Sequence, residues 1–136
     1  MADLWIPLVA PSSITNTTTA GLAVSGTSGG VIVPADYVFT MGTRVEVRLC
    51  SFLRGDVDET IEINLGYQRA DITVEDIVAT RIRASSGAMA VWQQVFSPFI
   101  DVTDFARRGA LAFLLRGRVS GGTGNIARPT LLLRLT

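Results

Sequence analysis

The clearest alternation of polar and apolar positions in the chain lies just before its midpoint. Arg44, Glu46 and Arg48 fall on one face, and the valine and leucine side chains between them fall on the other. A period of two predicts a β-strand with one buried face. Residues 60–67 alternate in the same way after an acidic turn. Their outward Glu62 has the charge to pair with Arg44 or Arg48 if the two strands form an antiparallel pair.

The C-terminal part of the chain is built on two apolar runs. The first covers residues 110–115 and the second covers residues 131–135, and residues 120–125 between them are rich in glycine. Two runs of strand length about such a loop predict a β-hairpin, and their continuous apolar character predicts strands that are covered on both faces. We therefore expect this hairpin to be the central scaffold of the fold.

Short strands and glycine-rich turns recur along the rest of the chain. Residues 78–83 and 88–96 alternate, residues 71–77 predict a helical turn or a loop, and residues 101–108 carry the capping signals of one short helix. A total of about eight strands with one or two short helical turns predicts an all-β fold, an antiparallel β-sandwich or jelly roll. Trp92 falls within the 88–96 strand, where we expect it to pack in the core.

Residues 1–30 differ in composition from the rest. Ser, Thr, Gly and Ala dominate residues 12–30, with isolated apolar side chains between them. The sequence thus divides into an extended N-terminal arm, residues 1–30, and a β-sandwich domain, residues 31–136. The arm is either a flexible leader or a segment that becomes ordered on a neighbouring subunit. In the second case the expected assembly contacts are Trp5, Ile14, Leu22, Val24, Arg107 and Arg108.

The composition argues against most enzyme chemistry. Histidine is absent and every basic residue is arginine, so the usual imidazole and lysine bases and metal ligands are missing. A net charge of zero gives no general case for binding nucleic acid or an anionic membrane. The single cysteine, Cys50, permits no disulfide within the chain. We expect no enzyme, no cofactor, no nucleic-acid or membrane partner, and no secretory signal at the N-terminus.

Four short motifs have a chemical interpretation beside a simpler structural one. Residues 54–56 match an adhesion tripeptide but suit a tight turn. The carboxylates of residues 56–59 could bind a hard cation such as calcium, or form a solvated turn. Asp101 and Asp104 could act as a catalytic pair, or cap the short helix. Residues 117–124 lack the lysine and the following helix of a phosphate loop. The structural interpretation is favoured in each case.

The layout of the whole chain resembles a known class of proteins. A β-sandwich without histidine or lysine, led by a Ser/Thr/Gly-rich arm and closed by a glycine-loop hairpin, is similar to the small accessory virion proteins of tailed bacteriophages. These include capsid cement, or decoration, proteins and the jelly-roll domains of head and tail fibres. The resemblance covers organisation and carries no motif from which family residues could be transferred.

The resemblance implies a structural protein of the virion, made in the host cytoplasm. Its partners would be copies of itself, with a trimer favoured, and a capsid or tail protein whose surface it binds and stabilises. The alternative is a carbohydrate- or receptor-binding domain of a phage fibre or tail. In that case the candidates for an aromatic platform that contacts sugar rings are Trp5, Trp92, Tyr67 and Tyr37.

Overall fold

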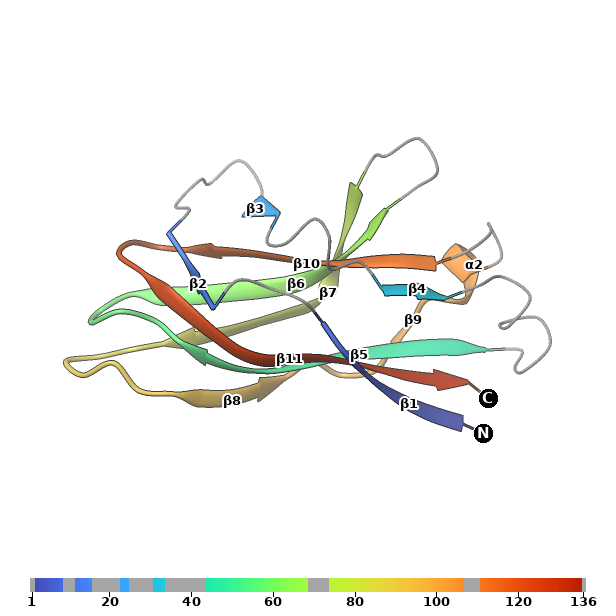
Figure 1. The fold of residues 1–136 in the computed structure, drawn as a ribbon, viewed down its shortest axis with the longest axis horizontal. Helices are drawn as coiled ribbons and strands as arrows, with labels where there is room; N and C mark the ends of the chain where they lie inside the picture. Colours follow the sequence, from blue (N-terminus) through green and yellow to red (C-terminus); the bar gives the residue numbers. More distant parts are fainter. Residues whose placement is uncertain are drawn as a thin grey trace.

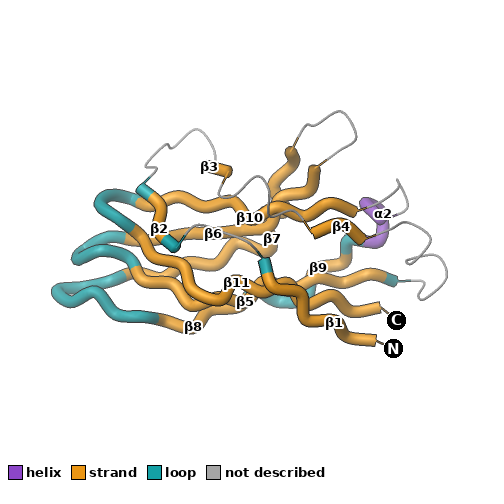
Figure 2. Tube along the Cα trace, viewed as in Figure 1, coloured by secondary structure: helices purple, strands orange, loops and turns teal. Residues whose placement is uncertain are grey.

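The computed structural model describes residues 2–8, 12–15, 23–24, 31–33, 44–68, 74–106 and 111–135. These residues form two antiparallel sheets that face each other as two layers (Figure 1). Nearly all of the traced elements are strands, with one short helix at the right-hand end of the view (Figure 2). The predicted all-β sandwich is confirmed.

The first sheet has six strands among the described residues and contains both ends of the chain. Its main path runs β1–β11–β5–β8, while β2 pairs with β11 and β9 pairs with β5. Ala2 lies opposite Leu135, so the start of β1 and the end of β11 lie side by side (Figure 1). The strands are β1 (Ala2–Pro7), β2 (Ser13–Ile14), β5 (Val45–Arg54), β8 (Gln93–Phe96), β9 (Ile100–Asp101) and β11 (Gly124–Leu135).

The second sheet has five strands among the described residues. Its path runs β3–β10–β6–β7, and β4 also pairs with β10. The short helix α2 (Thr103–Ala106) follows β9 of the first sheet in the chain and precedes β10 of the second sheet. The strands are β3 (Ala23–Val24), β4 (Val31–Val33), β6 (Thr60–Gln68), β7 (Val74–Ser85) and β10 (Leu111–Val119).

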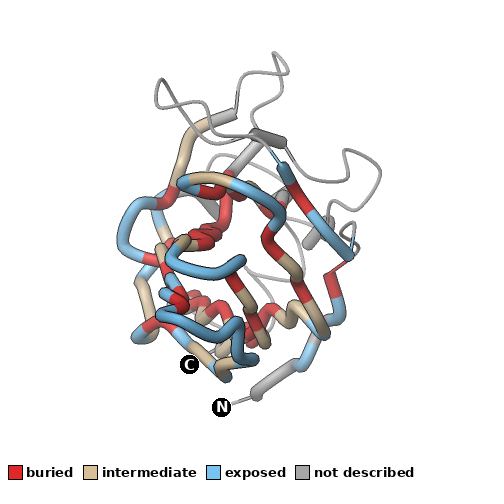
Figure 3. The backbone as a smooth tube through the Cα atoms, turned by 90° about the vertical axis from the view of Figure 1, so that its left-hand side faces the viewer, coloured by how far each residue is buried: buried red, intermediate tan, exposed pale blue. Residues whose placement is uncertain are grey.

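The core lies between the two layers (Figure 3). The alternation in β5 buries Val45, Val47 and Leu49, whereas Glu46 and Arg48 remain partly exposed on the outer face. Inward side chains of β6 and β10 meet them from the other sheet. The fully buried large side chains are Phe113, Leu49, Leu53, Ile61, Ile63, Leu65, Leu115, Leu131, Leu133 and Val45.

The predicted C-terminal hairpin is wrong, because β10 and β11 belong to opposite sheets. The loop at residues 120–123 carries the chain from one layer to the other, and each flanking strand lies in the interior of its own sheet. The predicted pair of β5 and β6 is wrong for the same reason, so Glu62 lies in the other layer from Arg44 and Arg48. A strand that returns in the opposite sheet buries the same alternate residues as one that returns beside its neighbour. The sequence pattern does not separate the two cases.

Two further expectations for the middle of the chain are corrected. Residues 74–77 belong to the long strand β7 and do not form a helical turn. The strand predicted over residues 88–96 is limited to Gln93–Phe96, and Trp92 lies outside it with 46% of its surface exposed, so it is not a core residue. No helix in the described part of the chain has the length and hydropathy needed to cross a membrane.

Candidate functional site

Arginine and aromatic side chains gather on the outer face of the six-stranded sheet. The Cζ atom of Arg48 lies 5.2 Å from the centre of the Phe96 ring and 4.4 Å from that of Phe99. The Cζ atom of Arg134 lies 3.9 Å from the centre of the Phe99 ring. Strand alternation in β5 and β11 explains the arrangement, because every second residue of each strand points away from the core. These contacts join three strands and the turn that follows β8.

The same face continues to both ends of the sheet. Arg54 lies 5.0 Å from the Trp92 ring. Trp5, which is 66% exposed, lies directly opposite Leu132, and Leu132 lies directly opposite Arg48. Directly opposed residues of neighbouring strands share a face. We call this surface the aromatic–arginine face and define it by Trp5, Arg48, Arg54, Trp92, Phe96, Phe99 and Arg134.

Cys50 lies in β5, where it points to the aromatic–arginine face and is partly buried. Burial raises the pKa of its thiol above the ordinary value of 9.0, and the positive charge of Arg48 opposes this shift only in part. The reactive form of a cysteine is the thiolate. The raised pKa lowers the fraction of Cys50 that is thiolate at neutral pH, and with it the reactivity of this thiol.

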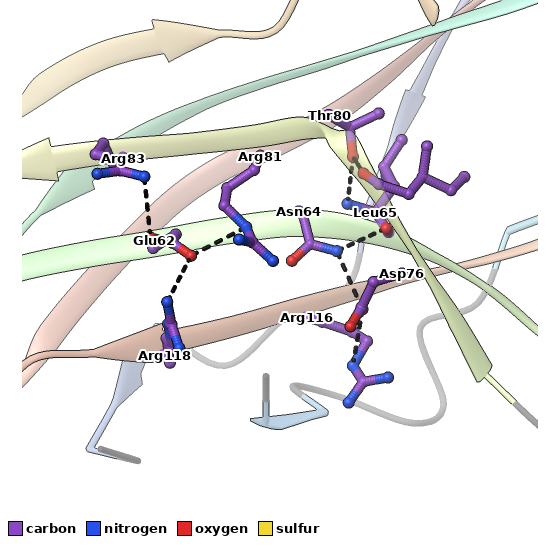
Figure 4. Close-up of polar contacts among 10 residues, drawn as sticks. Glu62, Asn64, Leu65, Asp76, Thr80, Arg81, Arg83, Arg116 and Arg118 are labelled. Atoms are coloured by element: carbon purple, nitrogen blue, oxygen red, sulfur yellow. Dashed lines mark hydrogen bonds and ion pairs between the residues drawn. The ribbon is translucent and has the colours of Figure 1, made fainter. Parts of the chain in front are cut away.

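A cluster of arginines surrounds one buried carboxylate on the outer face of the five-stranded sheet (Figure 4). The Oε1 atom of Glu62 in β6 lies 3.0 Å from Arg81 Nε and 3.3 Å from Arg118 Nη2 in ion pairs, and its Oε2 atom lies 3.6 Å from Arg83 Nη2. The register explains the arrangement, since Glu62 lies between Arg83 of β7 and Arg118 of β10. We call these four residues the Glu62 cluster. It carries one negative and three positive charges.

A wide bulge in β7 brings Arg81 to this cluster. Ile63 and Leu65 of β6 pair with residues of β7 that are five positions apart, so several residues of β7 lie opposite Asn64 alone. The Thr80 hydroxyl accepts the Leu65 backbone N–H at 2.9 Å, which replaces a lost ladder hydrogen bond. The buried Asn64 side chain donates to the Leu65 carbonyl and to Asp76. The backbone N–H and C=O groups of Leu65 thereby have hydrogen-bond partners, as buried polar groups require.

A shallow groove of about 390 Å³ joins the two surfaces at one side of the sandwich. It lies between β7 and β8, which end the strand paths of the two sheets. Arg81 and Arg83 belong to the Glu62 cluster, and Phe96 belongs to the aromatic–arginine face. The groove is lined by Arg81, Ile82, Arg83, Gln94, Val95 and Phe96.

The predicted assembly contacts lie in different environments. Trp5 is exposed in β1, whereas Ile14 of β2 is buried in the core of its own chain. Val24 lies in β3, where its backbone pairs opposite Arg116 of β10. Leu22, Arg107 and Arg108 lie outside the described residues. The assembly role of these six residues stays a prediction, and so does the division into an arm at residues 1–30 and a domain at residues 31–136.

The turn at residues 54–59 has the structural role that its sequence favoured. Gly55 is buried and its carbonyl accepts the Ser86 hydroxyl at 2.8 Å. The side chain of Asp56 accepts the backbone N–H of Val57 at 2.9 Å, and Asp58 has a positive φ of 60°. Among the residues that the structure describes, no group of three His, Cys, Asp or Glu side chains could hold a metal ion.

Asp101 caps the start of α2. Its Oδ1 atom accepts both the hydroxyl of Thr103 at 2.6 Å and the backbone N–H of Thr103 at 2.9 Å. These hydrogen bonds lower the pKa of Asp101 below 3.8, and Arg44, whose Nε lies 3.3 Å from Oδ2, adds to the shift. A general acid needs a raised pKa. The lowered pKa of Asp101 therefore fits a helix-capping role.

The aromatic–arginine face and the Glu62 cluster were not predicted from the sequence. A signal for the cluster was present, because Arg81 and Arg83, and likewise Arg116 and Arg118, stand two positions apart. Such pairs place two arginines on one face of a strand. The strand order that brings Arg81, Arg83 and Arg118 to Glu62 could not be derived from one sequence.

No protein-family model matches the chain, and no curated protein matches it. Solved structures of virus particles share its fold. A chain of the T13 particle of infectious bursal disease virus has a TM-score of 0.58 and 12% identity, covering 97% of this chain and 30% of that chain. A chain of the Gt strain of that virus has a TM-score of 0.54 and 12% identity, covering 97% and 32%. A chain of the Gx strain has a TM-score of 0.54 and 11% identity, covering 99% and 37%.

This chain thus spans about a third of the length of the virus chains that it matches. At these identities the likeness establishes a common β-sandwich fold.

Proposed function

We propose that this chain is a structural virion protein, and more closely a capsid cement, or decoration, subunit that binds and stabilises the surface of a viral shell. The observation that carries the proposal is the fold, which matches chains of infectious bursal disease virus particles over 97% of its length. This role needs subunit contacts and no catalysis. The proposed partners are further copies of the chain, as a trimer, and a capsid or tail protein.

The outer surfaces of the sandwich support a role in assembly. Tryptophan, phenylalanine and arginine are enriched at the centres of protein interfaces. The aromatic–arginine face presents Trp5 and Phe96, which are 66% and 62% exposed, next to arginines stacked on rings. A stacked guanidinium keeps its outer edge available for carboxylates of a partner. Such a surface suits contact with a protein shell.

Particles purified from the source of this chain provide the test of the proposed function. We expect antibodies against the chain to label the outside of intact particles in electron microscopy. Release of the chain under mild conditions should leave closed shells that rupture at a lower temperature. Particles that contain none of the chain would refute the proposal. The oligomer mass in solution tests the trimer, which requires three times the 14.5 kDa of one chain.

Trp5 tests whether the N-terminal segment contributes to shell binding. Deletion of residues 1–30 would remove β1 and β2 from the sheet, so a single exposed side chain is the better target. We expect Trp5→Ser to weaken rebinding of the released chain to depleted shells while its circular dichroism spectrum stays unchanged. Val78→Ser is the matched control, because Val78 is also an exposed apolar residue but lies on β7. Undiminished rebinding of the Trp5 variant would refute the contact.

A carbohydrate- or receptor-binding domain of a fibre or tail is the second candidate function. The observation that favours it is Trp92, a partly exposed ring with Arg54 stacked on it and Gln93 beside it in sequence. Indole faces bind the apolar faces of sugar rings. We expect binding on a glycan array to be lost in Trp92→Ala and kept in Met89→Ala, which removes another exposed apolar side chain. Absence of any glycan signal from the unmodified chain would exclude this function on the array tested.

A further inference from the structure

We propose that the groove between β7 and β8 binds an extended, acidic segment of a partner protein. This inference rests on the proposed function, because it supplies the chemistry of the shell protein that the chain would bind. Three features of the groove lead to it: an excess of positive charge on one wall, an exposed aromatic ring on the other, and two sheet edges that run along it.

The charge of the groove favours an anionic ligand. Arg81 and Arg83 line the groove, and with Arg118 they share the single carboxylate of Glu62. The cluster therefore has an excess of two positive charges. Arg81 contacts Glu62 through Nε and Arg83 through one terminal nitrogen, so further guanidinium donors remain for carboxylates of a ligand. Glu62 also fixes both arginines in place before a ligand binds.

The other side of the groove favours a protein ligand with apolar side chains. Phe96 is 62% exposed at the rim. Ile82 and Val95 are inward-facing residues of the two edge strands and form the floor. In an extended segment, successive side chains point in opposite directions. Such a segment can present carboxylates to the arginines and an apolar side chain to the phenylalanine ring at the same time.

The backbone of both walls is suited to an extended partner. β7 and β8 end the strand paths of their sheets, and the described residues place no further strand beyond either of them. An edge strand presents unpaired N–H and C=O groups that an added strand can use. The four residues of β8 give such a strand about 13 Å of edge. Backbone hydrogen bonds along a strand edge require a peptide backbone in the ligand, and we therefore infer a protein segment here.

The test measures binding of a synthetic peptide to the full chain by fluorescence polarisation. The probe is a labelled ten-residue peptide of alternating Glu and Val, and the matched control peptide has Gln in place of Glu. We expect the acidic peptide to bind at least about fivefold more tightly. We also expect Arg83→Gln and Phe96→Ser each to weaken its binding by about fivefold or more, as loss of a central contact does.

The variants are chosen so that folding does not decide the result. Arg83 and Phe96 are both mostly exposed, and unchanged circular dichroism spectra would confirm that each variant folds. Arg128→Gln is the matched control for charge, because Arg128 is exposed and does not line the groove. Its affinity for the acidic peptide should equal that of the unmodified chain.

Three results would overturn the proposal. The first is equal affinity for the acidic and neutral peptides, and the second is full binding of the acidic peptide by Arg83→Gln. The third is displacement of the peptide by a ten-residue oligothymidylate whose own binding is lost in Arg83→Gln. That third result would identify a nucleic-acid site. The assay contains no virus particles, so its failure is separate from that of the proposed function. If the chain binds particles but does not bind the acidic peptide, the groove proposal is refuted and the virion role is not. Peptide binding by a chain that is absent from particles refutes the virion role alone.

Discussion

Replacement of Glu62 by glutamine removes one buried negative charge and leaves three arginines facing one another. The Glu62 side chain is 8% exposed, and its carboxylate lies 3.0, 3.3 and 3.6 Å from nitrogens of Arg81, Arg118 and Arg83. Removal of one partner from a fully buried pair costs about 3–5 kcal/mol, whereas a surface pair contributes about 1 kcal/mol or less. Glu62 is buried but its partners are partly exposed and screened. We therefore expect Glu62→Gln to lower the free energy of unfolding by about 2–3 kcal/mol.

Urea unfolding followed by fluorescence gives the measurement. The midpoint should fall while the slope with denaturant stays constant, which indicates a change in stability alone. Asp58→Asn is the matched control, because Asp58 is an exposed loop carboxylate whose positive φ suits asparagine. It should change stability by less than about 0.5 kcal/mol.

A double-mutant cycle separates repulsion among the arginines from a general packing defect. In the Glu62→Gln background, the further change Arg83→Gln removes one unbalanced positive charge and should restore part of the lost stability. In the unmodified chain, the same change should be neutral or slightly destabilising. Coupling of this sign is expected only for residues in one charge network. Additive losses, or a Glu62→Gln effect no larger than that of the control, would refute the electrostatic account.

Three further predictions concern packing and titration. Gly124→Ala should lose about 1–3 kcal/mol in urea unfolding, because its Cβ would lie 2.5 Å from a core valine, while Gly87→Ala, with nothing within 4 Å, should be neutral. The lowered pKa of Asp101 stabilises the fold above pH 3.8 and this contribution is lost as the pH falls through the lowered pKa. An NMR titration of the Asp101 carboxyl should give a midpoint below 3.8, and this midpoint should rise in Thr103→Val. An unchanged midpoint in Thr103→Val would contradict the capping role of Asp101. Iodoacetamide should alkylate Cys50 at pH 8 more slowly than it alkylates free cysteine, since burial raises its pKa above 9.0, and equal rates would contradict this.

The inward faces of the strands were predictable because backbone geometry alone sets a period of two. In β5, the residues assigned to the buried face from sequence, Val45, Val47 and Leu49, are all fully buried. The pairing of strands was not predictable in the same way. Alternation specifies which face of a strand is buried, but it does not specify which strand lies beside it. The sequence therefore predicted a pair of β5 and β6, although these strands lie in opposite sheets.

Contacts between residues far apart in the sequence join the two loops where β6 and β11 cross to the other layer. The Ser120 backbone N–H donates to the Thr60 carbonyl, and the Thr60 N–H donates to the Ser120 hydroxyl. These bonds hold together the two loops that change sheets. Gly122, with a φ of +62°, packs so closely on Asp56 that an added Cβ would lie 2.5 Å from its carboxylate oxygen. Contacts between residues about 60 positions apart leave no local signal in the sequence.

The aromatic–arginine face and the groove could not be predicted from the sequence for a related reason. Phe96 and Trp92 are apolar residues, and composition alone favours placing them in the core. Phe96 lies on the outer face of β8, which no second layer covers, and Trp92 lies in the segment just before β8. Arg48 and Arg54 of β5 cover the rings in place of a second layer. The arginine-only composition therefore has a structural use at this face, since the planar guanidinium stacks on a ring as an ammonium group does not.

Phe96 connects the two surfaces and makes them depend on each other. Arg48 lies over its ring on the aromatic–arginine face, and Phe96 also lines the groove together with Arg81 and Arg83. A partner segment in the groove would cover this ring and hold Arg48 more firmly against it. A subunit that contacts the aromatic–arginine face would in turn fix the wall against which the segment binds. Because thermodynamic coupling is reciprocal, each contact would strengthen the other by the same factor. The edge between β7 and β8 is where this sandwich can form both contacts at once.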